Sequence, residues 1–253
     1  MKVKVISMQY GSISDVGRIR KINEDNYHIE NEGPYPYAIV ADGMGGHQAG
    51  EVASLMVVDI VGNHIAKYLH EGLEYVEAAE VIRRALINAN SIVYNYANDH
   101  YKVMGMGTTT TLSMIYGDKL ITAHVGDSRA YSVNEYSIRQ VTRDHSYVQE
   151  LVEMGRLTPQ EAKNNPKKNF ITRAVGAEKD VKIDIIIEPY NGETILLCSD
   201  GLSNLVEDDE IFNCVRYSEN LQAAVETLRD MANERGGTDN ITVAAIVKEK
   251  ECK

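Results

Sequence analysis

The sequence contains few cysteines and no long apolar run. Its three cysteines, Cys198, Cys214 and Cys252, are an odd number without a C-x-x-C pair, so neither a disulfide framework nor a zinc ribbon is predicted. A reducing compartment, the cytoplasm, is expected instead. No apolar stretch approaches the roughly 18 residues of a membrane span, and no apolar signal-peptide core follows Met1. We therefore expect a protein that is neither secreted nor bound to a membrane.

Positive charge is also scarce. The chain has 26 Lys and Arg residues against 37 Asp and Glu residues, a formal net charge of -11. Such a surface repels a polyanion over most of its area, which argues against nucleic acid as a partner. The excess of carboxylates has two interpretations. They form a well-hydrated surface, or some of them surround cations.

The chain shows no internal repeat, low-complexity tract or Pro/Ser-rich linker. We therefore expect a single domain covering residues 1–253, and a monomer. Helical spacing of apolar residues predicts helices at 48–69, 74–100 and 221–235. Short stretches rich in β-branched residues predict strands at 37–41, 108–116, 120–125, 130–133, 183–187, 194–197 and 241–247.

The order of these elements favours an α+β architecture. Strands come in hairpin-like groups and helices in pairs, without regular βαβ alternation, which is typical of antiparallel sheets with segregated helices. Residues 144–175 differ from the rest, because glycine, proline and asparagine surround only a short helical stretch at 147–154. This segment is predicted to be an excursion on the surface.

Four aspartates stand where predicted strands end beside glycine or asparagine. They are Asp42, Asp127, Asp200 and Asp239. One Asp-Gly pair is ordinary turn chemistry, but several carboxylates at one sheet edge repel one another unless cations lie between them. Oxygen ligands suit Mg²⁺ or Mn²⁺, and no His/Cys cluster at zinc spacing competes. The pattern therefore favours a metal site.

Phosphoester hydrolysis is the chemistry that such a site suits. Two hard cations about 3.5–4 Å apart can activate a bridging water and stabilise in-line displacement at phosphorus. Arg20 lies in the basic run 17–26, and its planar guanidinium can bind one phosphoryl group through two parallel N–H···O hydrogen bonds. Taken alone, that run is also what a solvated basic turn looks like.

Six short motifs follow one another along the chain: Arg20-x-x-Asn23-Glu24-Asp25, Ala41-Asp42-Gly43-Met44-Gly45-Gly46-His47, Met106-Gly107-Thr108-Thr109, Val125-Gly126-Asp127-Ser128-Arg129, Cys198-Ser199-Asp200-Gly201-Leu202 and Gly237-Thr238-Asp239-Asn240-Ile241-Thr242-Val243. In this order they resemble the protein phosphatase 2C family, the metal-dependent serine/threonine phosphatases, and especially its compact bacterial members. The resemblance spans most of the chain.

The resemblance implies a four-layer αββα sandwich, two packed antiparallel sheets flanked by helix pairs. It also implies a binuclear Mn²⁺ or Mg²⁺ centre at one edge of the sandwich. By matching position, Asp42 would bridge the two ions and the Gly43 carbonyl would bind one of them. Asp200 and Asp239 would hold the other ion.

Further roles follow from the same resemblance. Glu24 and Asp25 would act through metal-bound water, and Arg20 would bind the substrate phosphate. Asp127, with Asp200, matches the ligands of a third metal ion in bacterial relatives. Residues 144–175 would form the flap beside the active site. The implied activity is hydrolysis of phosphoserine and phosphothreonine in proteins, opposing a bacterial serine/threonine kinase.

The general acid is not assigned by these motifs. Animal members of the family have a histidine directly after the Asp-Gly step, whereas this chain has Met44. His47 is close in sequence, but its place at the start of a predicted helix favours packing or capping over proton transfer. A metal-bound water is the other candidate.

Other activities fit the sequence less well. A cysteine phosphatase is excluded because Asn204 stands where its loop needs arginine after Cys198. The stretch 126–130 lacks the last glycine of a serine hydrolase elbow, and 43–50 lacks the lysine of a P-loop. Two alternatives remain open: an inactive regulatory module of the same fold, disfavoured because the ligand aspartates are present, and a metal phosphoesterase for small molecules.

Overall fold

The computed structural model describes residues 8–45 and 49–249. Its strands are β1 (Met8–Asp15), β2 (Asp25–Glu30), β3 (Tyr37–Met44), β4 (Gly107–Thr108), β5 (Thr110–Tyr116), β6 (Lys119–Val125), β7 (Arg129–Val133), β8 (Ile138–Gln140), β9 (Asp184–Pro189), β10 (Thr194–Cys198) and β11 (Ile241–Lys248). They form two antiparallel sheets. One has the order β1-β11-β10-β7-β8, and the other has the order β2-β3-β5-β6-β9, with β4 paired to β3.

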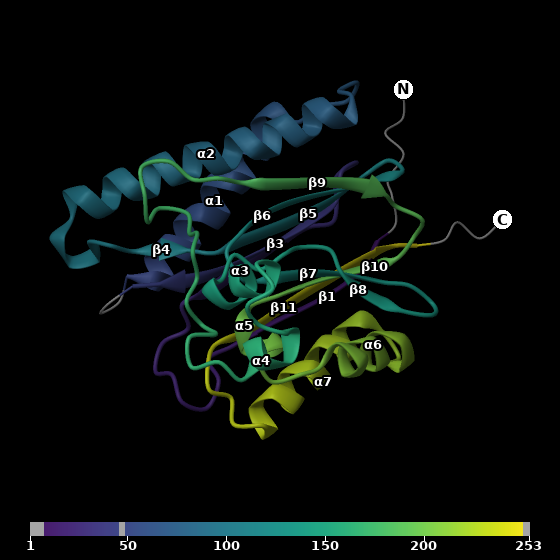
Figure 1. Ribbon diagram of the computed structural model, residues 1–253. Helices are drawn as coiled ribbons and strands as arrows, with labels where there is room; N and C mark the ends of the chain where they lie inside the picture. Colours follow the sequence, from purple (N-terminus) through teal and green to yellow (C-terminus); the bar gives the residue numbers. More distant parts are fainter. Residues whose placement is uncertain (1–7, 46–48, 250–253) are drawn as a thin grey trace.

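Helices cover the outer face of each sheet (Figure 1). The helices are α1 (Gly50–Tyr68), α2 (Tyr75–Asp99), η1 (Tyr101–Val103), α3 (Tyr147–Glu153), α4 (Pro159–Lys163), α5 (Asp200–Ser203), α6 (Asp208–Tyr217) and α7 (Leu221–Glu234). The long pair α1 and α2 packs on the sheet that contains β3 and β6, and α6 and α7 pack on the sheet that contains β1, β8 and β11.

Three separate clusters of buried apolar side chains fill the spaces between these layers. Strand β3 contributes side chains to two of these clusters. Tyr37, Ile39 and Ala41 face the helix pair, while Ala38 and Val40 face the opposite sheet. This alternation follows from the two-residue period of a strand. The predicted α+β sandwich of four layers is therefore confirmed.

The strands that the sequence did not predict lie mostly at sheet edges. β1 and β2 are the first strands of their sheets in spatial order, and β8 is the last of its sheet. Their side chains alternate between polar and apolar without a buried apolar run, so their pattern is weak. Helix α6 was also missed, because only Ile211 within it is buried. The predicted strands and the helices at 48–69, 74–100 and 221–235 appear within a few residues of their expected bounds.

Residues 144–175 leave the sandwich and return to it at the same place. Their two short helices, α3 and α4, have few buried side chains. Ser146 pairs with Ile171, and Val175 pairs with Thr108 beside β3. The His145 backbone N–H donates to the Gly126 carbonyl at 2.7 Å. One end of the excursion is therefore fastened to the turn that carries Asp127, and the other end to β4, which pairs with β3.

Across the described ranges, no helix combines the length and the apolar content that crossing a bilayer requires.

Candidate metal centre

Five aspartates from separate elements lie close enough for their charges to interact. Beyond the effect of burial, the charges of the other four raise the pKa of Asp42: Asp25, Asp200, Asp127 and Asp239. The register of β2 and β3 places Asp25 directly opposite Asp42. Asp200 follows β10, and Asp239 stands two residues before β11, the neighbour of β10. Asp127 lies in the turn between β6 and β7. The predicted convergence of strand-end carboxylates is therefore present.

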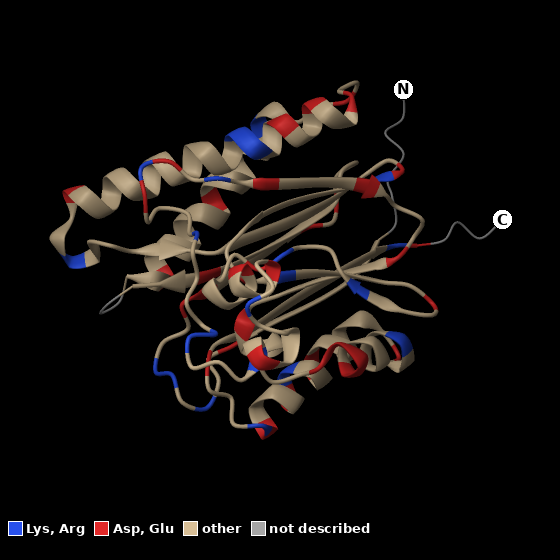
Figure 2. Cartoon of the chain, in the orientation of Figure 1, with Lys and Arg blue, Asp and Glu red and all other residues tan. Residues whose placement is uncertain are grey.

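A cavity of about 250 Å³ lies among these side chains. Figure 2 shows acidic residues where the central strands end, beside the basic loop that precedes β2. Asp25 does not line the cavity and lies behind it, at 5% exposure. The other predicted site residues all line it: Arg20, Glu24, Asp42, Gly43, Asp127, Asp200 and Asp239.

Two glycines let the backbone approach closely here. A Cβ on Gly43 would lie 2.1 Å from the Gly50 carbonyl oxygen at the start of α1. A Cβ on Gly126, whose φ is +111°, would lie 2.5 Å from the Cβ of Thr109. Thr109 also accepts a hydrogen bond from the Asp42 backbone N–H at 3.0 Å. Strand β3, which carries Asp42, and the turn that carries Asp127 are thus packed against the same threonine.

The carboxyl groups raise one another's pKa values. Burial, followed by the neighbouring carboxylates, raises the pKa of Asp42 and of Asp127 well above the usual range. Burial also raises the pKa of Asp25 to about 7 and that of Asp200 to about 6. These groups therefore keep protons at pH values where an isolated carboxyl is ionised. Cations in the cavity would replace those protons and remove the repulsion.

The donor set fits hard divalent cations. Carboxylate oxygens are the ligands that Mg²⁺ and Mn²⁺ prefer, and no histidine or cysteine lines the described cavity. The Oδ1 atom of Asp25 is buried without a hydrogen-bond partner, as expected for an oxygen that serves water or a cation.

The arrangement is not a finished coordination shell. Among residues 8–45 and 49–249, no three acidic, histidine or cysteine side chains are placed so that they hold a metal ion together. Asp200 and Asp42 are hydrogen-bonded to each other, and Asp239 accepts from Arg20. Ligation would replace the protons of these carboxyl groups, with other oxygens completing the shell.

Arg20 stands at the rim of the cavity. Its Nη2 donates to Asp239 Oδ2 at 2.8 Å, and its Nη1 lies 3.9 Å from Glu24 Oε2. The side chain is 47% exposed. A guanidinium has five N–H donors, so the bond to Asp239 leaves others for an incoming anion.

Comparison with known proteins places the chain in a family. The profile described as protein phosphatase 2C matches residues 19–238. The chain belongs to the protein phosphatase 2C family. It is 37% identical over 241 residues to the serine/threonine phosphatase stp of Listeria monocytogenes, covering 93% of this chain and 94% of that protein. It is also 37% identical to the protein phosphatase PhpP of Streptococcus pneumoniae, covering 96% and 99% of the two chains.

Solved structures of the family share the fold. The Mycobacterium tuberculosis phosphatase PstP/Ppp is 32% identical with a TM-score of 0.87, over 96% of this chain and 99% of that one. Stp1 from Staphylococcus aureus is 33% identical with a TM-score of 0.88, over 98% and 96%. The catalytic domain of PstP, solved with two manganese ions, is 31% identical with a TM-score of 0.84, over 97% and 100%. The prediction of a metal-dependent protein phosphatase is confirmed at the level of the family.

Sequence reasoning missed how the loop of Arg20 is held in this protein phosphatase 2C fold. The Asn240 amide donates to the carbonyls of Val16 and Ile22 at 3.0 Å, and its Oδ1 accepts from the Glu24 N–H at 2.8 Å. Asn240 thus fixes Arg20 and Glu24 relative to its neighbour Asp239. The only signal in the sequence was its place in the Gly-Thr-Asp-Asn motif.

Glu51 was also missed. It lies in the first turn of α1, and its Oε2 is buried without a partner. Burial raises the pKa of Glu24, and the nearby Glu51 charge raises it further. Ser54, one turn later, donates from Oγ to the Glu24 carbonyl at 2.6 Å. The start of α1 therefore supports the acidic wall of the cavity, which the helical spacing alone did not indicate.

The general acid remains unassigned by position. Met44, the residue directly after the Asp42-Gly43 step, lines the cavity, and its thioether has no proton to donate. His47, weighed above for packing or capping, lies outside the described residues.

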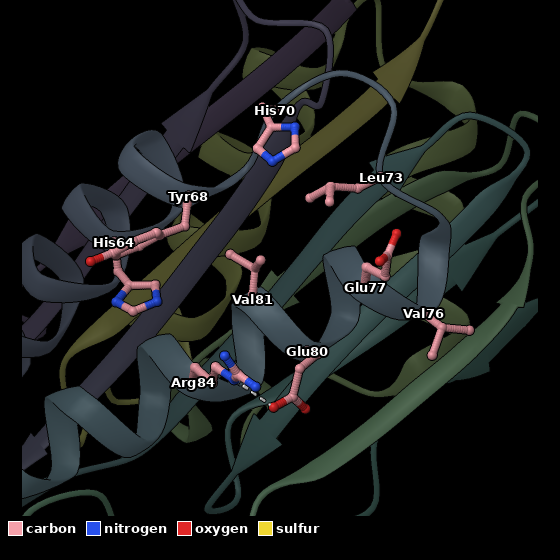
Figure 3. A pocket seen from close by; sticks show the side chains of 9 residues that line it. All are labelled: His64, Tyr68, His70, Leu73, Val76, Glu77, Glu80, Val81 and Arg84. Atoms are coloured by element: carbon pink, nitrogen blue, oxygen red, sulfur yellow. Dashed lines mark hydrogen bonds and ion pairs between the residues drawn. The ribbon is translucent and has the colours of Figure 1, made fainter.

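A cavity larger than the aspartate cavity lies elsewhere in the described part of the chain. It measures about 840 Å³ and opens between the end of α1 and the start of α2 (Figure 3). Glu80 on its wall is bound by Arg84, and His64, Tyr68 and Val81 supply other parts of the wall. It holds no group of carboxylates comparable to the aspartate cavity, so its size does not make it the catalytic site.

Proposed function

We propose that this chain hydrolyses phosphoserine and phosphothreonine in proteins at a binuclear Mn²⁺ or Mg²⁺ centre. The observation that carries the proposal is the convergence of Asp42, Asp127, Asp200 and Asp239 on one cavity with Arg20 at its rim. The raised pKa values of Asp42, Asp127 and Asp200 support cation binding, because a cation stabilises the ionised carboxylates that burial disfavours.

Each residue has a proposed task. Asp42 and the Gly43 carbonyl would bind one ion, with Asp42 shared between both ions, and Asp200 and Asp239 would bind the other. Asp127 with Asp200 would hold a third ion. When bound, the ions supply an activated water and neutralise charge at phosphorus.

The remaining tasks belong to groups around that ligand set. Glu24 and Asp25 would orient water around the ions. Asp25 is itself oriented by Ser199, whose Oγ donates to Asp25 Oδ2 at 2.7 Å. Arg20 would hold the phosphoryl group over the cavity through its free N–H groups.

The setting of this activity is part of the proposal. The substrates would be phosphorylated proteins, in line with the names of the bacterial relatives. They would include a serine/threonine kinase whose signals the phosphatase reverses. We place the protein in the cytoplasm as a monomer with one catalytic domain, residues 1–253, in which 144–175 form a flap. Cys198 and Cys214 are free thiols, which suits a reducing compartment.

A substrate panel in the presence of Mn²⁺ tests the proposed activity. We expect phosphothreonine and phosphoserine peptides to give kcat/KM values at least about tenfold above those of phosphorylated sugars, because a peptide contacts surface beyond the cavity. A preference for small phosphometabolites would instead identify a small-molecule phosphoesterase. Hydrolysis of neither class, with the fold intact by circular dichroism, would identify an inactive module.

Arg20→Ala is expected to raise KM for a phosphopeptide by roughly tenfold to a hundredfold, with a smaller effect on kcat. That increase in KM corresponds to about 1.5–3 kcal/mol, the usual contribution of hydrogen bonds to a charged group. Because Arg20 also bonds Asp239, Mn²⁺ affinity is measured in parallel to separate the two effects. Lys21→Ala, an exposed change one residue away, is the matched control. An unchanged KM in Arg20→Ala contradicts the phosphate-binding role.

A further inference from the structure

A second cavity adjoins the aspartate cavity. It measures about 350 Å³, and it shares the side chains of Met44 and Ile171 with the aspartate cavity. Beyond that shared wall it continues along the segment from Thr172 to Lys182. We call this second cavity the side groove. The side groove begins where the aspartate cavity ends, so a substrate polypeptide bound at the aspartate cavity passes the opening of the side groove.

The side groove is largely apolar where it meets the aspartate cavity. Met44, Ile171, Ala174, Ala177 and Val181 contribute apolar side chains to its lining. An apolar surface of this kind next to a reacting centre favours a nonpolar group of the ligand.

The charged groups of the groove do not favour an anion. Arg173 donates from Nη1 to Asp184 Oδ1 at 3.0 Å, so its charge is already balanced. Farther along, Glu178 and Asp180 stand beside Lys182. The two carboxylates would repel a second phosphate there, whereas they would not repel a neutral side chain.

Hydrogen bonds within the protein hold the segment that lines the groove. Gly176 donates its N–H to Asn90 Oδ1 at 2.7 Å, and the Asn90 amide donates to the carbonyls of Glu178 and Lys179 at 3.1 and 3.0 Å. Asn90 is buried within α2. Pairing of Val175 with Thr108 fixes the other end of the segment. A preformed groove binds without the entropy cost of ordering a loop.

We propose that the side groove receives an apolar side chain of the substrate polypeptide, close in sequence to the phosphorylated residue. The inference rests on the proposed protein phosphatase function and specifies which substrates it prefers. An extended polypeptide advances about 3.3 Å per residue. A residue within two positions of the phosphothreonine therefore reaches the neighbouring cavity once the phosphate lies beside Asp42. Met44 and Ile171 would separate the two side chains.

Synthetic phosphopeptides test the preference directly. One leucine is placed in turn at each position within two residues of phosphothreonine, in an otherwise glycine and serine sequence. We expect one position to raise kcat/KM by about tenfold or more over the peptide without leucine, because a buried apolar side chain contributes that much discrimination. Replacing that leucine by aspartate is expected to abolish the gain.

Variants of Ala177 connect the preference to the groove. Ala177 is exposed and lines the groove, but it does not line the catalytic cavity. Ala177→Tyr fills the groove and is expected to remove the leucine preference. The matched control Ala177→Ser leaves the groove open and is expected to keep it. Both variants are expected to hydrolyse capped phosphothreonine, which has no flanking residues, with unchanged kcat/KM; this also shows that they fold.

Two outcomes overturn the inference while leaving the proposed function intact. One is hydrolysis of all the peptides with kcat/KM values within about twofold of one another. The other is a leucine preference that survives unchanged in Ala177→Tyr. If capped phosphothreonine and every phosphopeptide resist hydrolysis in Mn²⁺, the proposed function itself fails, and the inference fails with it.

Discussion

Removal of divalent cations is expected to abolish phosphoester hydrolysis and, at neutral pH, to lower the free energy of unfolding of the chain. The first effect follows from the proposed role of the cations at phosphorus. The second follows from the aspartate cavity alone. Asp42, Asp127, Asp200 and Asp239 lie around a space of about 250 Å³, and without cations their charges repel one another.

The direction of the pH dependence follows from the raised pKa values. Burial raises the pKa of Asp25 from 3.8 to about 7 and that of Asp200 from 3.8 to about 6. The folded chain then binds more protons than the unfolded chain, so its stability decreases as pH rises. Without cations, this contribution is fully present below about pH 4 and is lost between about pH 4 and pH 7. Bound cations oppose the loss, and their affinity increases over the same range as protons leave.

Thermal unfolding at pH 5 and pH 7.5, with and without Mn²⁺, measures this effect. At a free Mn²⁺ concentration a hundred times its Kd, stabilisation of about 2.7 kcal/mol is expected from binding to the folded state alone. At pH 5 the same Mn²⁺ concentration should stabilise less. NaCl at equal ionic strength is the control for screening. Activity that continues undiminished in EDTA, or an unfolding temperature that does not respond to Mn²⁺, would rule out the proposed centre.

The buried strands were predictable because their sequences must be apolar. β3 packs against a helix pair on one face and against the other sheet on the opposite face, so Tyr37–Ala41 forms an unbroken apolar run. β1 offers no such run. Its Gly11 is dictated by close packing, since a Cβ there would lie 2.5 Å from the Leu221 backbone on α7. That constraint comes from a partner 210 residues away, which no local pattern shows.

The site was predictable to the extent that its residues stand in short motifs. Asp42 lies near the end of an apolar strand, and Asp200 and Asp239 lie within two residues of one. This position marked them in the sequence. The support of the site is different. Asn240 binds the loop of Arg20 through three hydrogen bonds, and Glu51 approaches Glu24 only because α1 begins beside Gly43. Such contacts depend on the register between elements and leave no periodic signal.

The group of aspartates lowers the stability of the metal-free fold. Each strand that ends at the cavity is fixed by apolar packing behind it, so the carboxylates cannot move apart to relieve their repulsion. Asp25 is held by Ser199, which directly follows β10 of the other sheet, and the Asp42 backbone is held by Thr109. The fold therefore maintains a strained group of charges where cations are needed, which is a usual cost of function.

Asp42→Asn is expected to remove nearly all activity while leaving the metal-free chain as stable as before, or more stable. Asparagine preserves the size of the side chain but removes one negative charge from the centre of the aspartate group. A fall in kcat on the order of a thousandfold, about 4 kcal/mol of transition-state stabilisation, is expected in saturating Mn²⁺. In EDTA at pH 7.5 the unfolding temperature is expected to rise, because folding then no longer buries a carboxyl group whose pKa burial and the neighbouring carboxylates raise well above its usual range.

Asp118→Asn is the matched control. Asp118 lies in the turn between β5 and β6, with its side chain 84% exposed, so the same chemical change should alter neither activity nor metal-free stability appreciably. A destabilised and inactive Asp42→Asn would mean that Asp42 acts mainly through structure. A stable variant with near-normal activity would mean that Asp42 is not a metal ligand. Opposite shifts, with activity lost and metal-free stability gained, are specific to a carboxylate that is kept for a cation, because neither a packing role nor a surface role produces both.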